Sequence, residues 1–266
     1  MSRIAAKFKE LRKRGEGALI AFVTAGDPNP RLTPEIAGVL ARHADILELG
    51  IPFSDPIADG PTIQAADERA LRAGTTPATV FGIIGRIRRK SGIPIVVLSY
   101  FNTVLRLGVK NFMRRLAAAG GDGVVVPDLP LEEAKEVSKV AKECGIDLIL
   151  LAAPTTPPKR LGQICSASRG FVYIVSVLGV TGARKMLSGE IRRVVMRSRA
   201  ASKGRIPLAV GFGISKPKHV REVLDCGADA AIVGSAFVNL IAKHRGNKAK
   251  MLRGLDQFGE ALKSAC

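Results

Sequence analysis

Eight short apolar segments constrain the fold of this 266-residue chain more than any other feature of its sequence. They are rich in β-branched residues, and most are apolar at consecutive positions instead of alternating positions. This pattern is typical of parallel strands that helices cover. The predicted strands are residues 18–25, 46–53, 93–101, 123–129, 147–153, 170–177, 207–214 and 230–238.

Helix signals separate these strands. Residues 131–144 begin with acidic side chains, carry lysines near their end and stop at Gly145, and residues 217–226 stop similarly at Gly227. The strand starts are 23 to 47 residues apart, which is the spacing of βα units. Eight units with no break in composition predict an α/β fold, a single (β/α)8 TIM barrel domain over residues 1–266 with an N-terminal lead-in helix. An open doubly wound sheet is the alternative, and no GxGxxG motif follows the first strand to favour it.

Composition excludes several classes of protein. No apolar stretch reaches the ~18 residues of a membrane-spanning helix, and the N-terminus lacks the apolar core of a signal peptide. We therefore expect a cytoplasmic protein with no membrane association. The four cysteines form no CxxC pair and are too widely spaced for a metal cluster, so reduced thiols are expected.

The chain is strongly basic, with 41 Lys and Arg against 23 Asp and Glu and a net charge of +18. The basic residues are scattered along the whole chain, and there is no Trp and only two Tyr for base stacking. This distribution disfavours nucleic-acid binding. It favours a basic exterior that also attracts anionic metabolites.

Three carboxylates gather around the second predicted strand. Glu48 lies inside that strand among apolar residues, where an ionised carboxylate costs several kcal/mol unless it is paired. A salt-bridged structural glutamate and a general acid/base with a raised pKa both fit this position. Asp55 and Asp59 follow in the next loop, where turn formation is the alternative to a catalytic role. The sequence therefore predicts a paired-carboxylate site at the end of this strand.

Other catalytic chemistry finds little support in the sequence. The three histidines fall in helical stretches between strands, which disfavours a histidine triad or a metal site. No Lys or Arg occurs inside a predicted strand, so a Schiff-base lysine in the barrel is not expected. The only tyrosines, Tyr100 and Tyr173, lie in the carboxyl-terminal halves of predicted strands, where each is either a core residue or a site residue.

Glycine-rich segments mark the ends of the last three predicted strands: residues 179–183 follow the sixth, and residues 211–215 and 233–236 end the seventh and the eighth. Such turns let backbone N–H groups converge on phosphate oxygens, and barrels often place a phosphate site after strands seven and eight. The residues thus predict a small phosphorylated substrate that meets carboxylates at its other end. They require no metal or organic cofactor in this chain.

Several motifs in the chain match those of one known family. Residues 47–64 (LELGIPFSDPIADGPTIQ) carry the most specific match, and residues 22–28, 126–130, 153–156, 179–182 and 211–215 add to it. On these residues the chain resembles the tryptophan synthase alpha subunit along nearly its whole length. The resemblance implies cleavage of indole-3-glycerol phosphate to indole and glyceraldehyde 3-phosphate, a lyase step in tryptophan biosynthesis.

The resemblance also implies residue roles by motif position. Glu48 would protonate indole C3 and take the side-chain hydroxyl proton, Asp59 would stabilise positive charge at the indole N–H, and Tyr173 would line the site beside Glu48. The implied phosphate contacts are Gly182, Gly213, Gly234 and Ser235. The implied indole pocket consists of Phe22, Leu98, Tyr100, Val125, Leu151 and Phe212.

A partner follows from the same resemblance. A tryptophan synthase beta subunit would bind in an alpha2-beta2 tetramer, with Pro52 and Asp55 at the interface, and would alone carry pyridoxal phosphate. Three other functions stay open. A phosphoribosyl isomerase would share only the glycine turns, and a free-standing indole-releasing lyase would need no partner. A regulatory barrel or nucleic-acid-binding module would not need both carboxylates.

Overall fold

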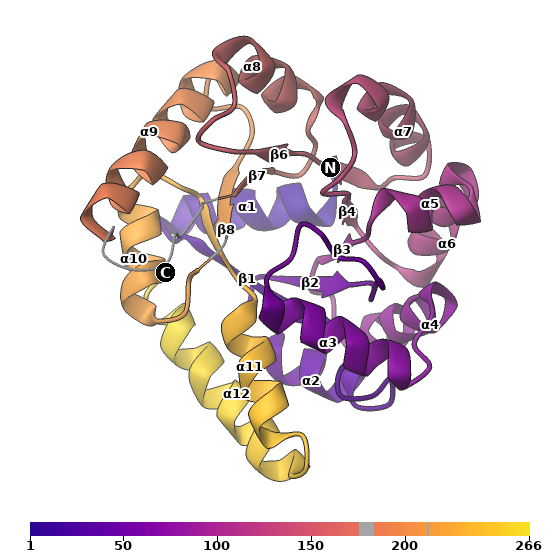
Figure 1. The fold of residues 1–266 in the computed structure, drawn as a ribbon. Helices are drawn as coiled ribbons and strands as arrows, with labels where there is room; N and C mark the ends of the chain where they lie inside the picture. Colours follow the sequence, from indigo (N-terminus) through magenta and orange to yellow (C-terminus); the bar gives the residue numbers. More distant parts are fainter. Residues whose placement is uncertain (176–183, 212) are drawn as a thin grey trace.

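The predicted parallel strands form the wall of a barrel in the computed structural model, which describes residues 1–175, 184–211 and 213–266 (Figure 1). All strand pairs are parallel, in the order β5-β4-β3-β2-β1-β9-β8-β7-β6. The strands are β1 (Ala18–Thr24), β2 (Ile46–Gly50), β3 (Ile95–Leu98), β4 (Gly123–Val125), β5 (Asp147–Ile149), β6 (Leu151–Ala152), β7 (Val172–Val175), β8 (Leu208–Gly211) and β9 (Ala230–Val233).

The two ends of this sheet are halves of one predicted strand. β5 and β6 are separated only by Leu150, and β5 pairs with β4 while β6 pairs with β7. The chain therefore closes the barrel through this strand. The eight predicted strands and the barrel are confirmed.

The predicted strands are too long at their carboxyl ends. The second ends at Gly50 instead of residue 53, and the third ends at Leu98 instead of residue 101. Tyr100, expected inside a strand, is instead the N-cap residue of α5. The error has a physical reason, because apolar residues continue past the strand ends and are buried there, as Ile51 and Tyr100 are.

The helices surround the strands (Figure 1). They are α1 (Arg3–Arg14), α2 (Thr33–Leu40), α3 (Pro61–Arg72), α4 (Pro77–Arg88), α5 (Phe101–Leu107), α6 (Val109–Ala119), α7 (Leu131–Glu143), α8 (Pro158–Ala167), α9 (Arg184–Ser202), α10 (Pro217–Asp225), α11 (Ser235–His244) and α12 (Lys248–Lys263). Within the described residues, no helix is long and apolar enough to cross a membrane.

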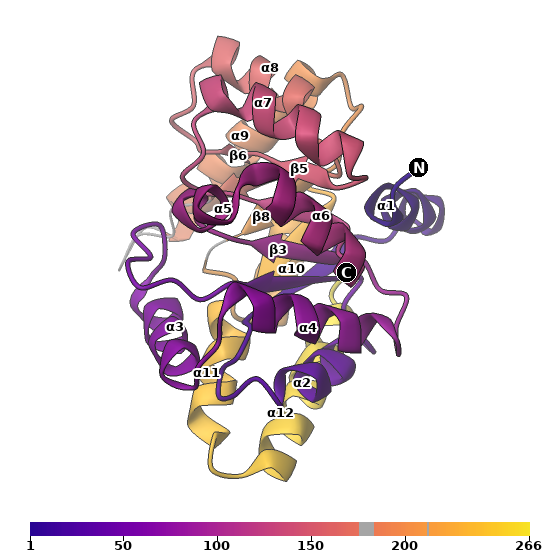
Figure 2. The ribbon, with the colours of Figure 1, turned by 90° about the vertical axis from the view of Figure 1, so that its right-hand side faces the viewer.

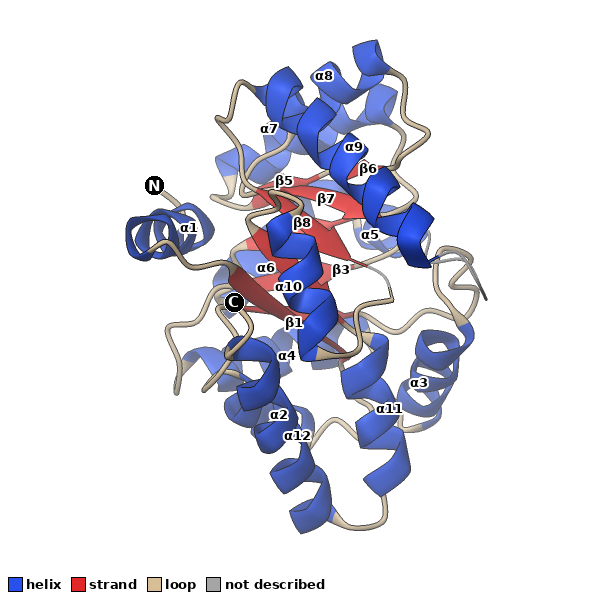
Figure 3. Cartoon of the chain, turned by 90° about the vertical axis from the view of Figure 1, so that its left-hand side faces the viewer, coloured by secondary structure: helices blue, strands red, loops and turns tan. Residues whose placement is uncertain are grey.

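The barrel interior is filled from the strands and closed at one end by α1. Inward residues such as Ile20, Ile46 and Val125 form one apolar cluster, and Phe8 and Leu11 of α1 join it. Outward strand residues form a second cluster with the surrounding helices. α1 lies across the amino-terminal end of the strands, whereas α3 lies near the opposite end (Figures 2 and 3). The predicted lead-in helix is confirmed and covers the end away from the carboxylates.

One histidine lies elsewhere than predicted. His43 is in the turn after α2, where its Nε2 is 2.7 Å from Asp256 Oδ1 of α12. His219 and His244 lie in α10 and α11, as expected. His43 thus links two outer helices and is not part of the barrel interior.

Candidate active site

Glu48 lies in the barrel interior. It is fully buried in β2, in register with Phe22 of β1 and Val96 of β3. Because side chains alternate along a strand, Glu48 shares the inward face with Ile46, whereas Leu47 and Leu49 face the helices. A glutamate on the inward face is surrounded by apolar side chains.

The carboxyl group of Glu48 is unsatisfied. Neither Oε1 nor Oε2 has a hydrogen-bond partner among the described residues. Burial, with a further contribution from the charge of Asp59, raises the pKa of Glu48 to about 8. A salt-bridged structural glutamate would have a cationic partner, and the described residues provide none, which disfavours the first of the two alternative roles. Glu48 therefore holds a proton at neutral pH that it can donate.

Asp59 is held at the mouth of the barrel by Tyr100. The Tyr100 hydroxyl donates a hydrogen bond to Asp59 Oδ2 at 2.7 Å and accepts one from the Ala58 backbone N–H at 3.0 Å. The Tyr100 ring is stacked on Phe53, with ring centroids 5.0 Å apart. Burial raises the pKa of Asp59, and the Tyr100 hydrogen bond opposes that rise. Tyr100, predicted as an indole contact, here positions the loop that carries Asp59.

Tyr173 lies beside the two carboxylates. It is buried on β7, and its pKa is raised by burial and then by the charges of Glu48 and Asp59. The neighbouring strand needs a glycine here, since a Cβ on Gly211 would lie 2.6 Å from the Tyr173 hydroxyl. The predicted catalytic group of Glu48, Asp59 and Tyr173 is therefore close enough to interact electrostatically.

The predicted apolar pocket residues come from strands around the whole barrel. Phe22 and Val125 are buried, and Leu98 and Leu151 are partly buried, all in the clusters that face the interior. Phe22 also contacts the β9 end, where a Cβ on Gly234 would lie 3.1 Å from its ring. Phe212 lies outside the described residues.

The predicted phosphate contacts lie at the carboxyl ends of β8 and β9. Gly213 is exposed with φ +73°, and Gly234 is the N-cap of α11, whose first residue is Ser235. Gly234 has no side chain to cap the helix, so the first N–H groups of α11 are available to an anion. Gly182 lies outside the described residues.

Sequence reasoning missed Asp67. This residue lies on the buried face of α3 together with Ile63, Ala66 and Ala70. Its Oδ1 accepts a hydrogen bond from the Thr24 hydroxyl, and its Oδ2 accepts one from the Phe53 N–H. Burial raises the pKa of Asp67 to about 7. The sequence did carry a signal for Asp67, because an acidic residue on the apolar face of an amphipathic helix is unusual.

Comparison with known proteins decides the family. The sequence profile described as tryptophan synthase alpha chain matches residues 8–266. The tryptophan synthase alpha chain of Trichormus variabilis is 47% identical over 100% of this chain and 98% of its own length. That of Methanocaldococcus jannaschii is 46% identical over 91% and 85%. The chain belongs to the tryptophan synthase alpha chain family.

Solved structures of the tryptophan synthase alpha chain family share the fold. The alpha subunit of Legionella pneumophila matches with a TM-score of 0.91 at 34% identity, covering 100% of this chain and 98% of that one. A chain of the Pyrococcus furiosus tryptophan synthase complex matches with a TM-score of 0.83 at 40% identity, covering 93% and 98%. The barrel and the family resemblance are thus confirmed together.

Proposed function

We propose that Glu48 and Asp59 are the catalytic carboxylates for cleavage of indole-3-glycerol phosphate to indole and glyceraldehyde 3-phosphate, the known reaction of this family. The observation that carries the assignment is Glu48 itself. It is buried on the inward face of β2, has no hydrogen-bond partner among the described residues and has a pKa of about 8. Structural carboxylates are normally paired, whereas a general acid needs this environment.

The proposed reaction uses the Glu48 carboxyl group twice, first as an acid and then as a base. The Glu48 carboxylic acid protonates indole C3, which makes the ring an electron-poor cation. The resulting Glu48 carboxylate takes the proton of the adjacent side-chain hydroxyl. The bond between C3 and the glycerol carbon then breaks, its electrons return to the ring, and the aldehyde forms. Glu48 ends protonated, so the cycle closes without an added reactant.

The remaining residues stabilise and place the substrate. In this proposal the Asp59 carboxylate accepts the indole N–H and stabilises the cation, and Tyr173 borders the reacting carbon. The apolar residues at the barrel mouth hold the indole, and the turns after β8 and β9 hold the phosphate. The electron sink is the protonated ring, so this chain needs no cofactor, and pyridoxal phosphate is expected only in a beta partner.

Indole release from indole-3-glycerol phosphate tests the function directly. The purified chain should release indole and glyceraldehyde 3-phosphate slowly, and faster when a tryptophan synthase beta subunit is added. A phosphoribosyl isomerase or a regulatory barrel would release no indole in either assay. A free-standing lyase would release it equally in both.

Tyr100→Phe should weaken catalysis while preserving the stack on Phe53. The change removes the hydroxyl that donates to Asp59 and accepts from Ala58. Hydrogen bonds to charged groups contribute about 1.5–3 kcal/mol, so we expect kcat/KM for indole release to fall at least ~10-fold. Circular dichroism checks that the fold survives. An unchanged kcat/KM would mean that Asp59 is positioned by other contacts.

Gly213→Val should abolish binding of glycerol phosphate. Gly213 has φ +73°, so valine places a side chain where the phosphate should approach and also strains the backbone. Gly145→Val is the matched control, because Gly145 has φ +72° and open space around its Cβ position. Both variants should lose similar stability, and calorimetry should show lost affinity only for Gly213→Val. Equal affinity in the two variants would place the phosphate elsewhere.

We also propose that a beta subunit is the partner of this chain. It would contact the loop between β2 and α3, and the two kinds of subunit would assemble in an alpha2-beta2 tetramer. Asp55 is exposed in that loop, and Ile57 beside it is 85% exposed. In this proposal the partner covers the Ile57 side chain and pairs with the Asp55 charge. Pro52 is buried, so it would support this loop and not contact the partner directly.

Asp55→Ala should separate partnership from catalysis. In the proposed complex Asp55 makes a charge contact with the beta subunit, which stabilises the loop that also carries Asp59. We expect indole release by the isolated variant to stay near normal and its activation by the beta subunit to be largely lost. Ser54→Ala is the control, because it removes the hydrogen bond that Ser54 donates to Asp55 but no charge. An unchanged activation ratio in Asp55→Ala would leave Asp55 as a turn residue only.

A further inference from the structure

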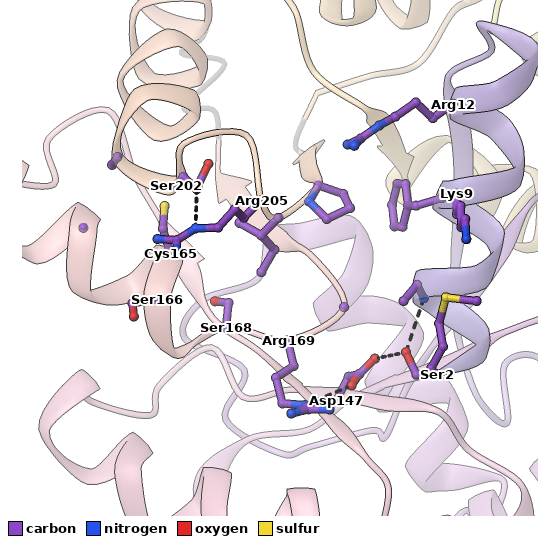
Figure 4. A pocket seen from close by; sticks show the side chains of 18 residues that line it. Ser2, Lys9, Arg12, Asp147, Cys165, Ser166, Ser168, Arg169, Ser202 and Arg205 are labelled. Atoms are coloured by element: carbon purple, nitrogen blue, oxygen red, sulfur yellow. Dashed lines mark hydrogen bonds and ion pairs between the residues drawn. The ribbon is translucent and has the colours of Figure 1, made fainter.

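A cavity lies at the opposite end of the barrel from Glu48 and Asp59. It has a volume of about 640 Å³ and lies between α1, α8, the end of α9, the first residue of β5 and the residues that precede β7 and β8 (Figure 4). Pockets of 300–1,000 Å³ with converging polar groups are the usual form of small-molecule sites. We refer to this space as the α1 cavity.

Four cationic side chains border the α1 cavity, namely Lys9, Arg12, Arg169 and Arg205. Lys9 and Arg205 are exposed, and no acidic side chain among the described residues pairs with either. Among the described residues, Arg205 makes one hydrogen bond, in which its Nε donates to the Ser202 carbonyl at 3.2 Å. Its terminal nitrogens are therefore available to a ligand.

Asp147, the acidic side chain that lines the α1 cavity, already has hydrogen-bond partners. Asp147 accepts a hydrogen bond from the Ser2 hydroxyl at 2.5 Å and one from Arg169 Nε at 3.3 Å. Arg12 has a long ion pair with Asp229, at 3.8 Å, and keeps most of its side chain exposed. The lining side chains thus carry four positive charges and one negative charge, and Asp229 offsets part of the charge of Arg12, so the cavity keeps a positive field that favours an anion.

The walls also carry groups for the rest of a ligand. Ser166 and Ser168 supply hydroxyls, and Phe8, Ile206 and Pro207 supply apolar surface. Ser168 accepts a hydrogen bond from the Leu150 N–H and donates none among the described residues, so its hydroxyl hydrogen can be donated to a ligand. An inorganic anion alone would leave the apolar wall without a partner, because the cavity is much larger than one phosphate group.

We propose that the α1 cavity is a binding site for a small organic diphosphate, separate from the catalytic end of the barrel. Lys9 and Arg205 bind the diphosphate oxygens, with Arg12 and Arg169 completing the positive field. The organic part lies along Phe8 and Pro207. Because α1 forms one wall, the bound ligand holds this helix against the barrel and stabilises the folded chain.

Calorimetry with pyrophosphate and with ADP tests this site. The double variant Lys9→Gln, Arg205→Gln should weaken binding of both probes at least ~10-fold, because it removes two charge-assisted contacts. Lys250→Gln, Arg253→Gln on α12 is the matched control, since it makes the same charge change at exposed positions. That control should bind both probes like the unmodified chain. If both double variants weaken binding equally, the loss comes from the lower net charge of the protein, and the proposed site is wrong.

The catalytic end could also bind the probes, so the titration is repeated with Gly213→Val. Binding to the α1 cavity should persist in Gly213→Val and weaken at least ~10-fold in the Lys9→Gln, Arg205→Gln variant. The reverse pattern would place the probes in the active site and overturn the proposal. ADP should bind more tightly than pyrophosphate if the apolar wall contributes, and equal or weaker binding would overturn its role as an organic diphosphate site. None of these measurements depends on indole release.

Discussion

Replacing Glu48 with Gln is expected to lower kcat for indole release at least ~100-fold while the chain stays folded. Glutamine matches glutamate in size but can neither donate a proton to indole C3 nor take the hydroxyl proton. Positioned proton transfer contributes about 10²–10⁴-fold to such reactions. Because the interaction is needed in the transition state, kcat should fall more than KM rises.

The matched control for this experiment is Glu136→Gln. Glu136 is exposed on α7, so the same chemical change there should leave turnover and stability near those of the unmodified chain. Indole is quantified under saturating substrate, and circular dichroism checks the fold. Near-normal turnover by folded Glu48→Gln would remove Glu48 from the mechanism and leave it a buried structural residue.

The same substitution should make the chain more stable at alkaline pH. The pKa of Glu48 is raised to about 8 in the folded state, against 4.5 without burial. Below about pH 4.5 the carboxyl group is protonated in both states, and its titration costs no stability. Above that pH the unfolded chain releases the proton while the folded chain retains it, so the folded state loses stability until about pH 8. The loss follows from linkage and not from any broken contact.

Urea unfolding at pH 5 and pH 8 measures this effect. Between these values the stability of Glu48→Gln should rise relative to the unmodified chain by up to about 4 kcal/mol, since the interval is about three pH units and one unit is equivalent to about 1.4 kcal/mol. Asp67, whose pKa is also raised, is present in both proteins, so its titration largely cancels in the difference. Glu136→Gln should show no such trend. A pH-independent difference would mean that Glu48 has an ordinary pKa and cannot be the acid.

Local sequence patterns determined most of the barrel. Continuous apolar segments and the helix signals between them depend on neighbours along the chain, and they predicted eight strands, the lead-in helix and the closed fold correctly. A carboxylate inside an apolar strand also stands out without a structure, because its burial is costly wherever the strand packs. Glu48 could therefore be selected as a candidate from the sequence.

Tertiary structure decided what these residues contact. Glu48 faces the barrel interior because strands from distant parts of the chain pack around β2. The same packing leaves its carboxyl group without a hydrogen-bond partner among the described residues. The Tyr100 hydrogen bond to Asp59 and the Thr24 hydrogen bond to Asp67 join residues 41 and 43 positions apart. A sequence pattern gives the number of residues between two side chains, but not whether the fold brings them into contact. The raised pKa of Glu48 comes from burial and from the charge of Asp59, and both exist only once the barrel has closed.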